Sequence, residues 1–116
     1  MQNIFNFPIP KVNEEGFYTI LKNDSVEIKT VVSNTLSTKR EFVSDRDEWV
    51  MLVQGCAKIF MDDTMHKLKK GDILFIPAGK KHTLSKTKKI AIWLCIYLTN
   101  NSTPDKPQKI STSIPV

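Results

Sequence analysis

Short segments in which apolar and polar residues alternate are the feature that most limits how this 116-residue chain can fold. Residues 26–32 alternate for most of their length, which suits a strand with one face toward solvent. No segment combines a helix cap with an apolar stripe at helical spacing. The sequence therefore predicts an all-β sandwich or small barrel. The other predicted strands are 17–21, 49–53, 56–61, 65–68, 73–76, 82–85 and 90–98.

Clusters of turn-forming residues separate these segments. Gln54 and Gly55 form a two-residue pair in which glycine supplies a positive φ. Residues 77–80 begin with a proline and include a glycine, which is typical of a rigid turn. Residues 73–76 are apolar on both faces, so we expect a central strand there. Residues 33–47 show no sustained period and are interpreted as a loop or an irregular strand.

The chain length allows one hydrophobic core, so we expect a single domain over residues 1–99 with its barrel at about 17–98. Residues 100–116 are polar and contain three of the six prolines, which predicts a disordered tail or an arm laid on a partner. Two cysteines do not make a disulfide framework. Cys56 and Cys95 have apolar neighbours and are both expected to be buried thiols.

The net charge of +5 is unevenly distributed, because residues 67–89 contain eight lysines and one acid. Only two of the 17 basic residues are arginines, so we interpret this stretch as a solvated lysine surface and do not expect a nucleic-acid partner. The apolar run 90–99 is half the length of a membrane helix, which excludes a membrane-spanning protein of that kind. No secretory signal is visible, so we expect a cytoplasmic protein.

Two spaced motifs surround the central predicted strands. Residues 71–82 follow the pattern G-x5-P-x-G-x2-H, which ends at His82, and residues 48–55 follow E-x6-G, which begins at Glu48. Together they closely resemble the two sequence motifs of the cupin superfamily of small β-barrel proteins. The resemblance covers residues 17–98 and implies an antiparallel jelly roll, also called a double-stranded β-helix. It also implies that the histidine lies near the barrel mouth.

The resemblance further implies how a metal would be held. Metal-binding cupins use a His-x-His pair and a glutamate from the first motif and a third histidine from the second, which together hold a divalent ion. Positions 41 to 44, where the paired histidines are expected, are instead Glu41, Phe42, Val43 and Ser44. Only Glu48 and His82 carry over. With Glu41 they would form a weak site for Mn, Fe, Ni or Zn.

The alternative to a metal is a hydrogen-bonded pair of Glu48 and His82 inside a polar pocket. In either case a carboxyl and an imidazole in one cavity are suited to acid and base catalysis. We expect Trp93 and Tyr97, both from residues 90–98, to line the same ligand pocket.

Three functions remain open at this stage. The first is a small-molecule-binding cupin without catalysis. The second is a metal-dependent oxygenase or isomerase that uses Glu48 and His82 with a compensating carboxylate. The third is a metal-free sugar-nucleotide isomerase or epimerase, in which His82 is the base and Lys80 or Lys81 meets phosphate. We also expect a homodimer, because residues 90–98 are apolar on both faces and a second subunit would cover one of them.

Overall fold

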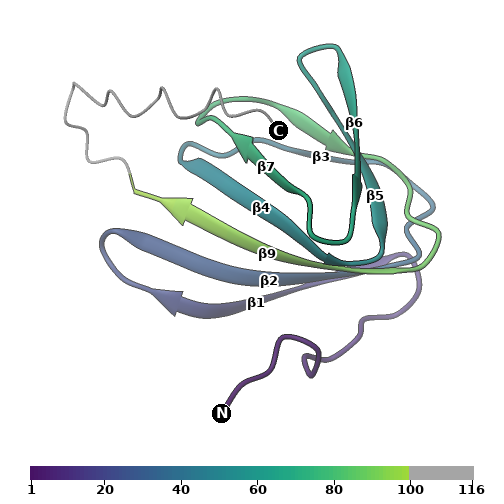
Figure 1. Ribbon diagram of the computed structural model, residues 1–116, viewed down its shortest axis with the longest axis horizontal. Coiled ribbons are helices and arrows are strands. Elements are labelled where there is room, and N and C mark those ends of the chain that lie inside the picture. Colours follow the sequence, from purple (N-terminus) through teal and green to yellow (C-terminus); the bar gives the residue numbers. More distant parts are fainter. Residues whose placement is uncertain (100–116) are drawn as a thin grey trace.

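The computed structural model describes residues 1–99, which form nine antiparallel strands in two facing sheets (Figure 1). One sheet has the order β1-β2-β9-β4-β7 and the other the order β3-β8-β5-β6. No helix occurs in the described range. The predicted all-β jelly-roll fold is therefore confirmed. The strands are β1 (Glu14–Lys22), β2 (Val26–Asn34), β3 (Arg40–Phe42), β4 (Asp47–Gln54), β5 (Cys56–Met61), β6 (Thr64–Lys69), β7 (Ile73–Ile76), β8 (His82–Leu84) and β9 (Ile90–Leu98).

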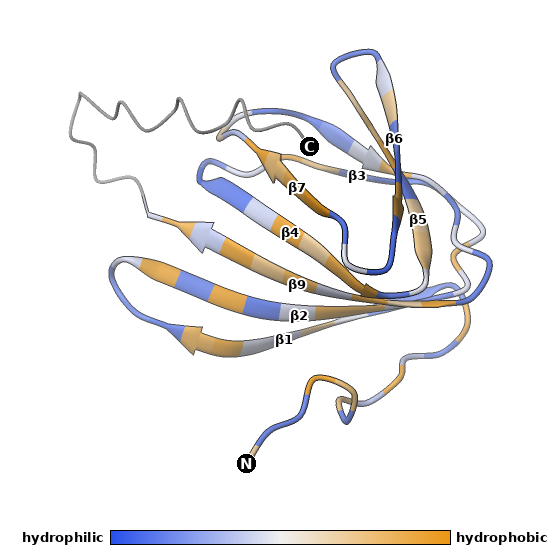
Figure 2. Ribbon diagram, viewed as in Figure 1, coloured by the Kyte–Doolittle hydropathy of each residue, from blue (hydrophilic) through white to orange (hydrophobic). Residues whose placement is uncertain are grey.

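The five-stranded sheet is organised around β9, which pairs with β2 on one side and with β4 on the other. Alternation along β9 directs Trp93 and Cys95 into the core between the sheets, while Leu94 and Ile96 lie on the outer face. Figure 2 shows the alternation along β2 and the more continuous apolar character of β9. The core therefore lies between two sheets, and one outer face is also apolar.

The position of β7 differs from the sequence-based prediction. We expected residues 73–76 to be central, but β7 is an edge strand that pairs with β4 alone. Leu74 and Ile76 belong to the core, whereas Ile73 is 53% exposed. The strand is apolar on both sides. Its inward residues belong to the core, and its outward residues, Ile73 and Phe75, belong to the apolar outer face of the sheet. The irregular stretch 33–47 contains the end of β2, the three-residue β3 and the start of β4.

The turn at Gly55 is as predicted, with a φ of 94°. A Cβ atom at this position would lie 2.7 Å from the carbonyl oxygen of Ile90, so the close approach requires glycine. The prediction for the next residue is wrong, because Cys56 is exposed while Cys95 is buried. In β5 the inward positions are Ala57, Ile59 and Met61, which directs Cys56 outward.

Residues 1–13, here called the N-terminal segment, pack against β1 and the end of β2 in the five-stranded sheet. The Tyr18 hydroxyl donates a hydrogen bond to the Pro8 carbonyl at 2.9 Å, and the Asn34 amide donates to the Pro10 carbonyl at 2.8 Å. Phe7 stacks on Tyr18 with ring centroids 5.3 Å apart. The predicted tail at 100–116 lies outside the described residues. Within them, no helix is long and apolar enough to cross a membrane.

Candidate ligand-binding cavity

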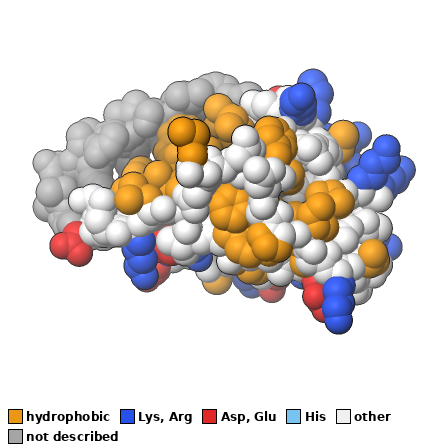
Figure 3. Space-filling model, turned by 90° about the horizontal axis from the view of Figure 1, so that it is seen from below, with side chains coloured by type: hydrophobic (Ala, Val, Ile, Leu, Met, Phe, Trp, Pro, Cys, Tyr) orange, Lys and Arg blue, Asp and Glu red, His pale blue; other side chains and the backbone are white. Residues whose placement is uncertain are grey.

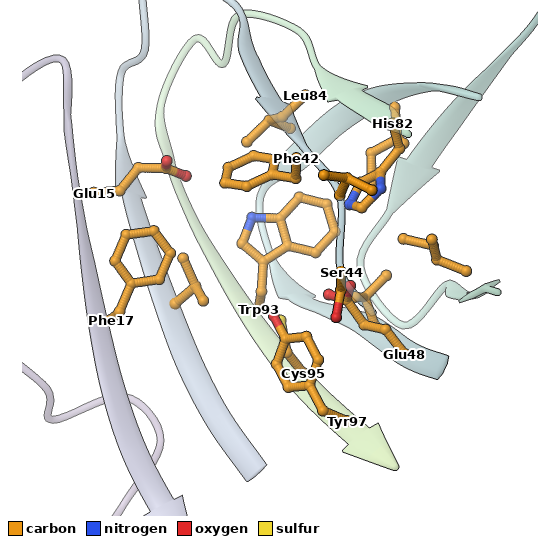
Figure 4. Close-up of a pocket in the computed structure, with 15 residues that line it drawn as sticks. Glu15, Phe17, Phe42, Ser44, Glu48, His82, Leu84, Trp93, Cys95 and Tyr97 are labelled. Atoms are coloured by element: carbon orange, nitrogen blue, oxygen red, sulfur yellow. The ribbon is translucent and has the colours of Figure 1, made fainter. Parts of the chain in front are cut away.

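A cavity of about 130 Å³ lies between the two sheets (Figure 4). Its walls are mostly apolar and include Val31 and Val50 from one sheet and Ile59 and Leu84 from the other. Ligand sites in proteins typically combine such walls with a few polar groups that orient the bound molecule. The polar or titratable side chains that line this cavity are Glu15, Ser44, Glu48, His82, Trp93, Cys95 and Tyr97.

Glu48 and His82 reach the cavity from facing sheets, because Glu48 belongs to β4 and His82 begins β8. The turn after β7 positions the histidine. Gly79 has a φ of 80°, and its amide donates a 2.6 Å hydrogen bond to the carbonyl of Ser44. Both Glu48 and His82 are only 5% exposed. Burial raises the pKa of the Glu48 carboxyl above its usual range, and the charge of His82 opposes that rise.

The predicted hydrogen bond between Glu48 and His82 is not present within residues 1–99, where a ring nitrogen of His82 bonds to a backbone carbonyl instead. The Tyr97 hydroxyl lies toward the Glu48 carboxyl and moderates the rise in the pKa of that group. The Nδ1 of His82 donates to the Lys80 carbonyl at 3.1 Å, so Nε2 is the ring nitrogen that can accept a hydrogen bond whenever it carries no proton. The imidazole also stacks on Phe42, its cross-strand neighbour, with centroids 5.8 Å apart.

Trp93 and Tyr97 both line the cavity from the inner face of β9. Trp93 is 4% exposed, and its indole nitrogen has no hydrogen-bond partner among the residues described. Burial raises the pKa of the Tyr97 phenol. Arg46 and Lys29 lie over the Tyr97 ring, 4.7 Å and 5.4 Å from its centroid. They line a surface groove that shares Tyr97 with the cavity, so the cavity meets the surface there.

Glu15 is a cavity residue that the sequence analysis missed. Its carboxylate accepts a 2.8 Å hydrogen bond from the Ser33 hydroxyl and lies 3.8 Å from the Nε of Arg40. Burial raises the pKa of the Glu15 carboxyl. The predicted strand 17–21 began too late to include it. Phe17 also lines the cavity, and alternation places residue 15 on the same face, so a predicted strand that began two residues earlier would have included Glu15.

Glu41 does not join Glu48 and His82, which corrects the predicted ligand set. In β3 the side chain of Phe42 lines the cavity, so the preceding Glu41 is exposed on the opposite side. Within residues 1–99, no group of three or more His, Cys, Asp or Glu side chains could hold a metal ion. His66 lies on β6, outside the cavity. One carboxylate and one imidazole do not fit the four-ligand set that the resemblance implied.

The comparisons with known proteins agree with this geometry. The model of the cupin domain family matches residues 30–97. Comparison with curated protein sequences gave no match. Among solved structures, the fold is similar to a candidate mannose-6-phosphate isomerase from Ralstonia eutropha JMP134. The TM-score is 0.72 at 27% sequence identity, over 84% of this chain and 96% of that one.

Two further solved structures share the fold. A cupin superfamily protein from Desulfitobacterium hafniense DCB-2 matches with a TM-score of 0.67 and 23% identity, over 78% of this chain and 83% of that one. The cupin domain of Schizosaccharomyces pombe Cnp3 matches with a TM-score of 0.74 and 14% identity, over 95% and 73% respectively. At these identities the likeness concerns the fold alone.

Proposed function

The chain belongs to the cupin domain family, and from that premise we propose that it is a small-molecule-binding cupin whose ligand occupies the cavity between the sheets. The observation that carries the proposal is the pair of buried groups, Glu48 and His82, which face one cavity from two different sheets. Titratable groups buried in an apolar cavity are unusual in a purely structural core and are common in binding sites.

The size of the cavity limits the ligand. An engineered protein cavity of about 150 Å³ holds benzene, so a cavity of 130 Å³ suits a molecule of about six to eight non-hydrogen atoms. The groove beside Tyr97 gives such a molecule a route to the surface. Its rim contains Arg46, which donates a 2.8 Å hydrogen bond to Glu27 and is thereby partly neutralised.

A fragment screen tests this proposal. Ring-sized alcohols, ketones, carboxylic acids and hydrocarbons are added to the protein and its melting temperature is measured. A fragment at 100 times its Kd should stabilise the fold by about 2.7 kcal/mol. Ser44→Phe, which puts a ring where the cavity meets the groove, should lose this stabilisation. Glu41→Gln is the matched control on the exposed side of β3. The proposal fails if no fragment stabilises the wild-type protein.

A second function, proton transfer on the bound molecule, is favoured by the two groups that carry the proposal. The buried carboxyl of Glu48 has a raised pKa, and the contact of His82 Nδ1 with the Lys80 carbonyl leaves Nε2 as the ring nitrogen that could take up a proton. The solved structure with which the chain shares 27% identity is a candidate isomerase, and proton transfer is one route by which a protein can isomerise a bound molecule. The metal-dependent alternative has only Glu48 and His82 as support among the described residues.

Deuterium exchange tests the proton-transfer function. A ring-sized ketone is incubated with the protein in D₂O, and incorporation at the carbon next to the carbonyl is measured by mass spectrometry. Wild-type protein should accelerate exchange, and His82→Gln should reduce that acceleration by a factor of about 10² or more. Glu41→Gln again serves as the control. Exchange no faster than in buffer, from a ketone shown to bind, would remove this second function and leave the binding proposal intact.

The outer face of the five-stranded sheet supports a further proposal, that the protein is a homodimer joined through this face. Cross-strand pairing places half-buried or exposed apolar side chains side by side along β2, β9, β4 and β7. The N-terminal segment packs near β1 and the end of β2, through Tyr18 and Asn34. Figure 3, which views the molecule from the side of β1, shows apolar side chains gathered near the middle of that surface. A second copy would bury the remainder against an identical apolar surface. The face consists of Ile28, Trp49, Met51, Ile73, Phe75, Leu94 and Ile96.

Sedimentation measurements test the homodimer. Wild-type protein should sediment as a dimer, and Ile96→Glu should sediment as a monomer because a buried unpaired charge opposes association. Phe60→Glu is the matched control, because Phe60 is 42% exposed on the outer face of the other sheet. A wild-type monomer at every concentration tested would contradict the proposal, as would equal effects of the two substitutions.

A further inference from the structure

The indole of Trp93 is the polar group of the cavity whose hydrogen bonding is incomplete. Its Nε1 has no hydrogen-bond partner among residues 1–99, although Trp93 is only 4% exposed. Nearly all buried N–H groups in folded proteins are paired. Figure 4 shows the indole in the middle of the lining residues, with its nitrogen on the side of Glu15. An acceptor atom on a bound molecule would give this N–H its missing hydrogen bond.

Glu15 supplies the complementary group at the same end of the cavity. Its side chain extends toward the region between Phe42 and the Trp93 nitrogen (Figure 4). One carboxylate oxygen is engaged by Ser33, and Arg40 is 3.8 Å from the other, so each oxygen still has an unused lone pair. A hydroxyl group placed here would accept from the indole N–H and donate to the carboxylate. A carbonyl oxygen would satisfy the indole alone.

The remaining walls limit the rest of the molecule to an uncharged, apolar ring. Val31, Val50, Ile59 and Leu84 offer no polar atoms. An anionic ligand would lie between Glu15 and Glu48, and the arginine nearest to Glu15 already donates hydrogen bonds to Thr38 and Asn13. An ammonium group has no acceptor atom, so it would leave the Trp93 N–H without a partner. The volume matches one ring with a single small substituent.

We propose that the ligand is an uncharged, ring-sized molecule with a hydroxyl group, and that the Trp93 N–H and the Glu15 carboxylate together recognise that hydroxyl. This proposal rests on the proposed function, because it assigns the chemical class of the molecule that occupies the same cavity. In this proposal Trp93 and Glu15 select a ligand with a hydroxyl group. This role is separate from that of Glu48 and His82.

Phenol and toluene are matched probes, because they have the same number of non-hydrogen atoms and differ in the hydroxyl group. Binding is measured at pH 7 by calorimetry and by the NMR signals of the two indole N–H groups, those of Trp49 and Trp93. Phenol should bind about five- to tenfold more tightly than toluene. Phenol alone should shift the Trp93 indole proton downfield, while the Trp49 signal on the outer face stays unchanged.

Two tryptophan variants extend the experiment. Trp93→Phe should abolish the preference for phenol while toluene still binds, and Trp49→Phe should retain the preference. Equal affinities for the two probes in wild-type protein would overturn the hydroxyl inference, since an ordered water on the indole would then explain the site, yet would leave a binding cavity. Failure of both probes, together with a fragment screen without hits, would overturn the proposed function as well.

The wild-type NMR measurement decides the question even if Trp93→Phe does not fold. Phenol that binds without moving the Trp93 indole signal more than toluene does would contradict recognition through Nε1. Glu15→Gln tests the second contact separately. It retains an acceptor oxygen but removes the charge, so it should weaken phenol binding about twofold to fivefold and leave toluene binding unchanged.

Discussion

Each face of the five-stranded sheet departs from the usual arrangement of a folded domain, and the two departures are opposite in kind. The inner face, which is buried, carries the carboxyl groups of Glu15 and Glu48. The outer face, which is partly exposed, is apolar across β9 and β4. Because charged groups avoid burial and apolar patches avoid water, each departure points to a partner. The inner face suits a small ligand, and the outer face suits a second protein surface.

Truncating one apolar side chain on each face should give the largest difference. Leu52 is fully buried in the core, so Leu52→Ala should lower the free energy of unfolding by about 3 kcal/mol. Ile73 is 53% exposed, and Ile73→Ala should cost less than about 1 kcal/mol. Urea denaturation of both variants in an Ile96→Glu background separates folding from association. Similar costs for the two truncations would contradict the assigned faces.

A smaller effect is expected at Thr30, a buried polar residue on the outward side of β2. Its hydroxyl donates a 2.9 Å hydrogen bond to the Trp93 carbonyl. Thr30→Val keeps the shape and removes the donor, so the free energy of unfolding should fall by about 1 kcal/mol. Thr19→Val is the control, because Thr19 is exposed on β1. A stabilised Thr30→Val variant would show that the hydrogen bond contributes nothing.

The pH dependence of Glu48 tests whether its burial on the inner face is unfavourable. The raised pKa means that the folded protein holds the proton more tightly than the unfolded chain does, so stability falls as the pH rises above 4.5. Glu48→Gln should therefore melt at a higher temperature than wild-type protein at pH 8, and the difference should vanish below pH 4.5. A lower melting temperature at pH 8 would contradict this assignment.

Glu27 provides the opposite sign on the same face. The Arg46 guanidinium donates to its carboxylate and lowers the pKa of Glu27, so this group stabilises the fold above pH 4.5. Glu27→Gln should melt at a lower temperature than wild-type protein at pH 7. The gap should close as the pH falls well below 4.5. Melting curves of both glutamine variants at five pH values would show the two trends crossing, and parallel curves would rule them out.

Local patterns predicted much of the fold, because alternation and turn residues act over a few positions. The strand 56–61 and the turn at Gly55 needed no information from distant residues. The edge position of β7 depends on which strands pair across the whole chain, which no local pattern encodes. The apolar pattern of that strand predicted burial on both faces, which is right for Leu74 and Ile76 and wrong for Ile73.

The site was predictable where a motif or a correctly bounded strand set the geometry, as for Trp93 and Tyr97 on the strand 90–98. Glu48 and His82 follow from the two motifs, and the structure brings both to one cavity. Glu41 was chosen for its charge and its distance along the chain, and a one-residue difference in strand parity placed Phe42 in the cavity instead. Glu15 was missed because the start of its strand was set too late. Both errors concern strand boundaries, which decide the side each residue faces.

The reaction rates of the two thiols report how often the two sheets separate. Cys56 is exposed and should react with an alkylating reagent at once, whereas Cys95 lies beside the cavity with its thiol pKa raised by burial. Mass spectrometry would therefore record one fast and one slow modification in the same molecule. The slow rate is set by the frequency of local opening that exposes β9. A molecule bound in the cavity would lower that frequency and slow the modification of Cys95.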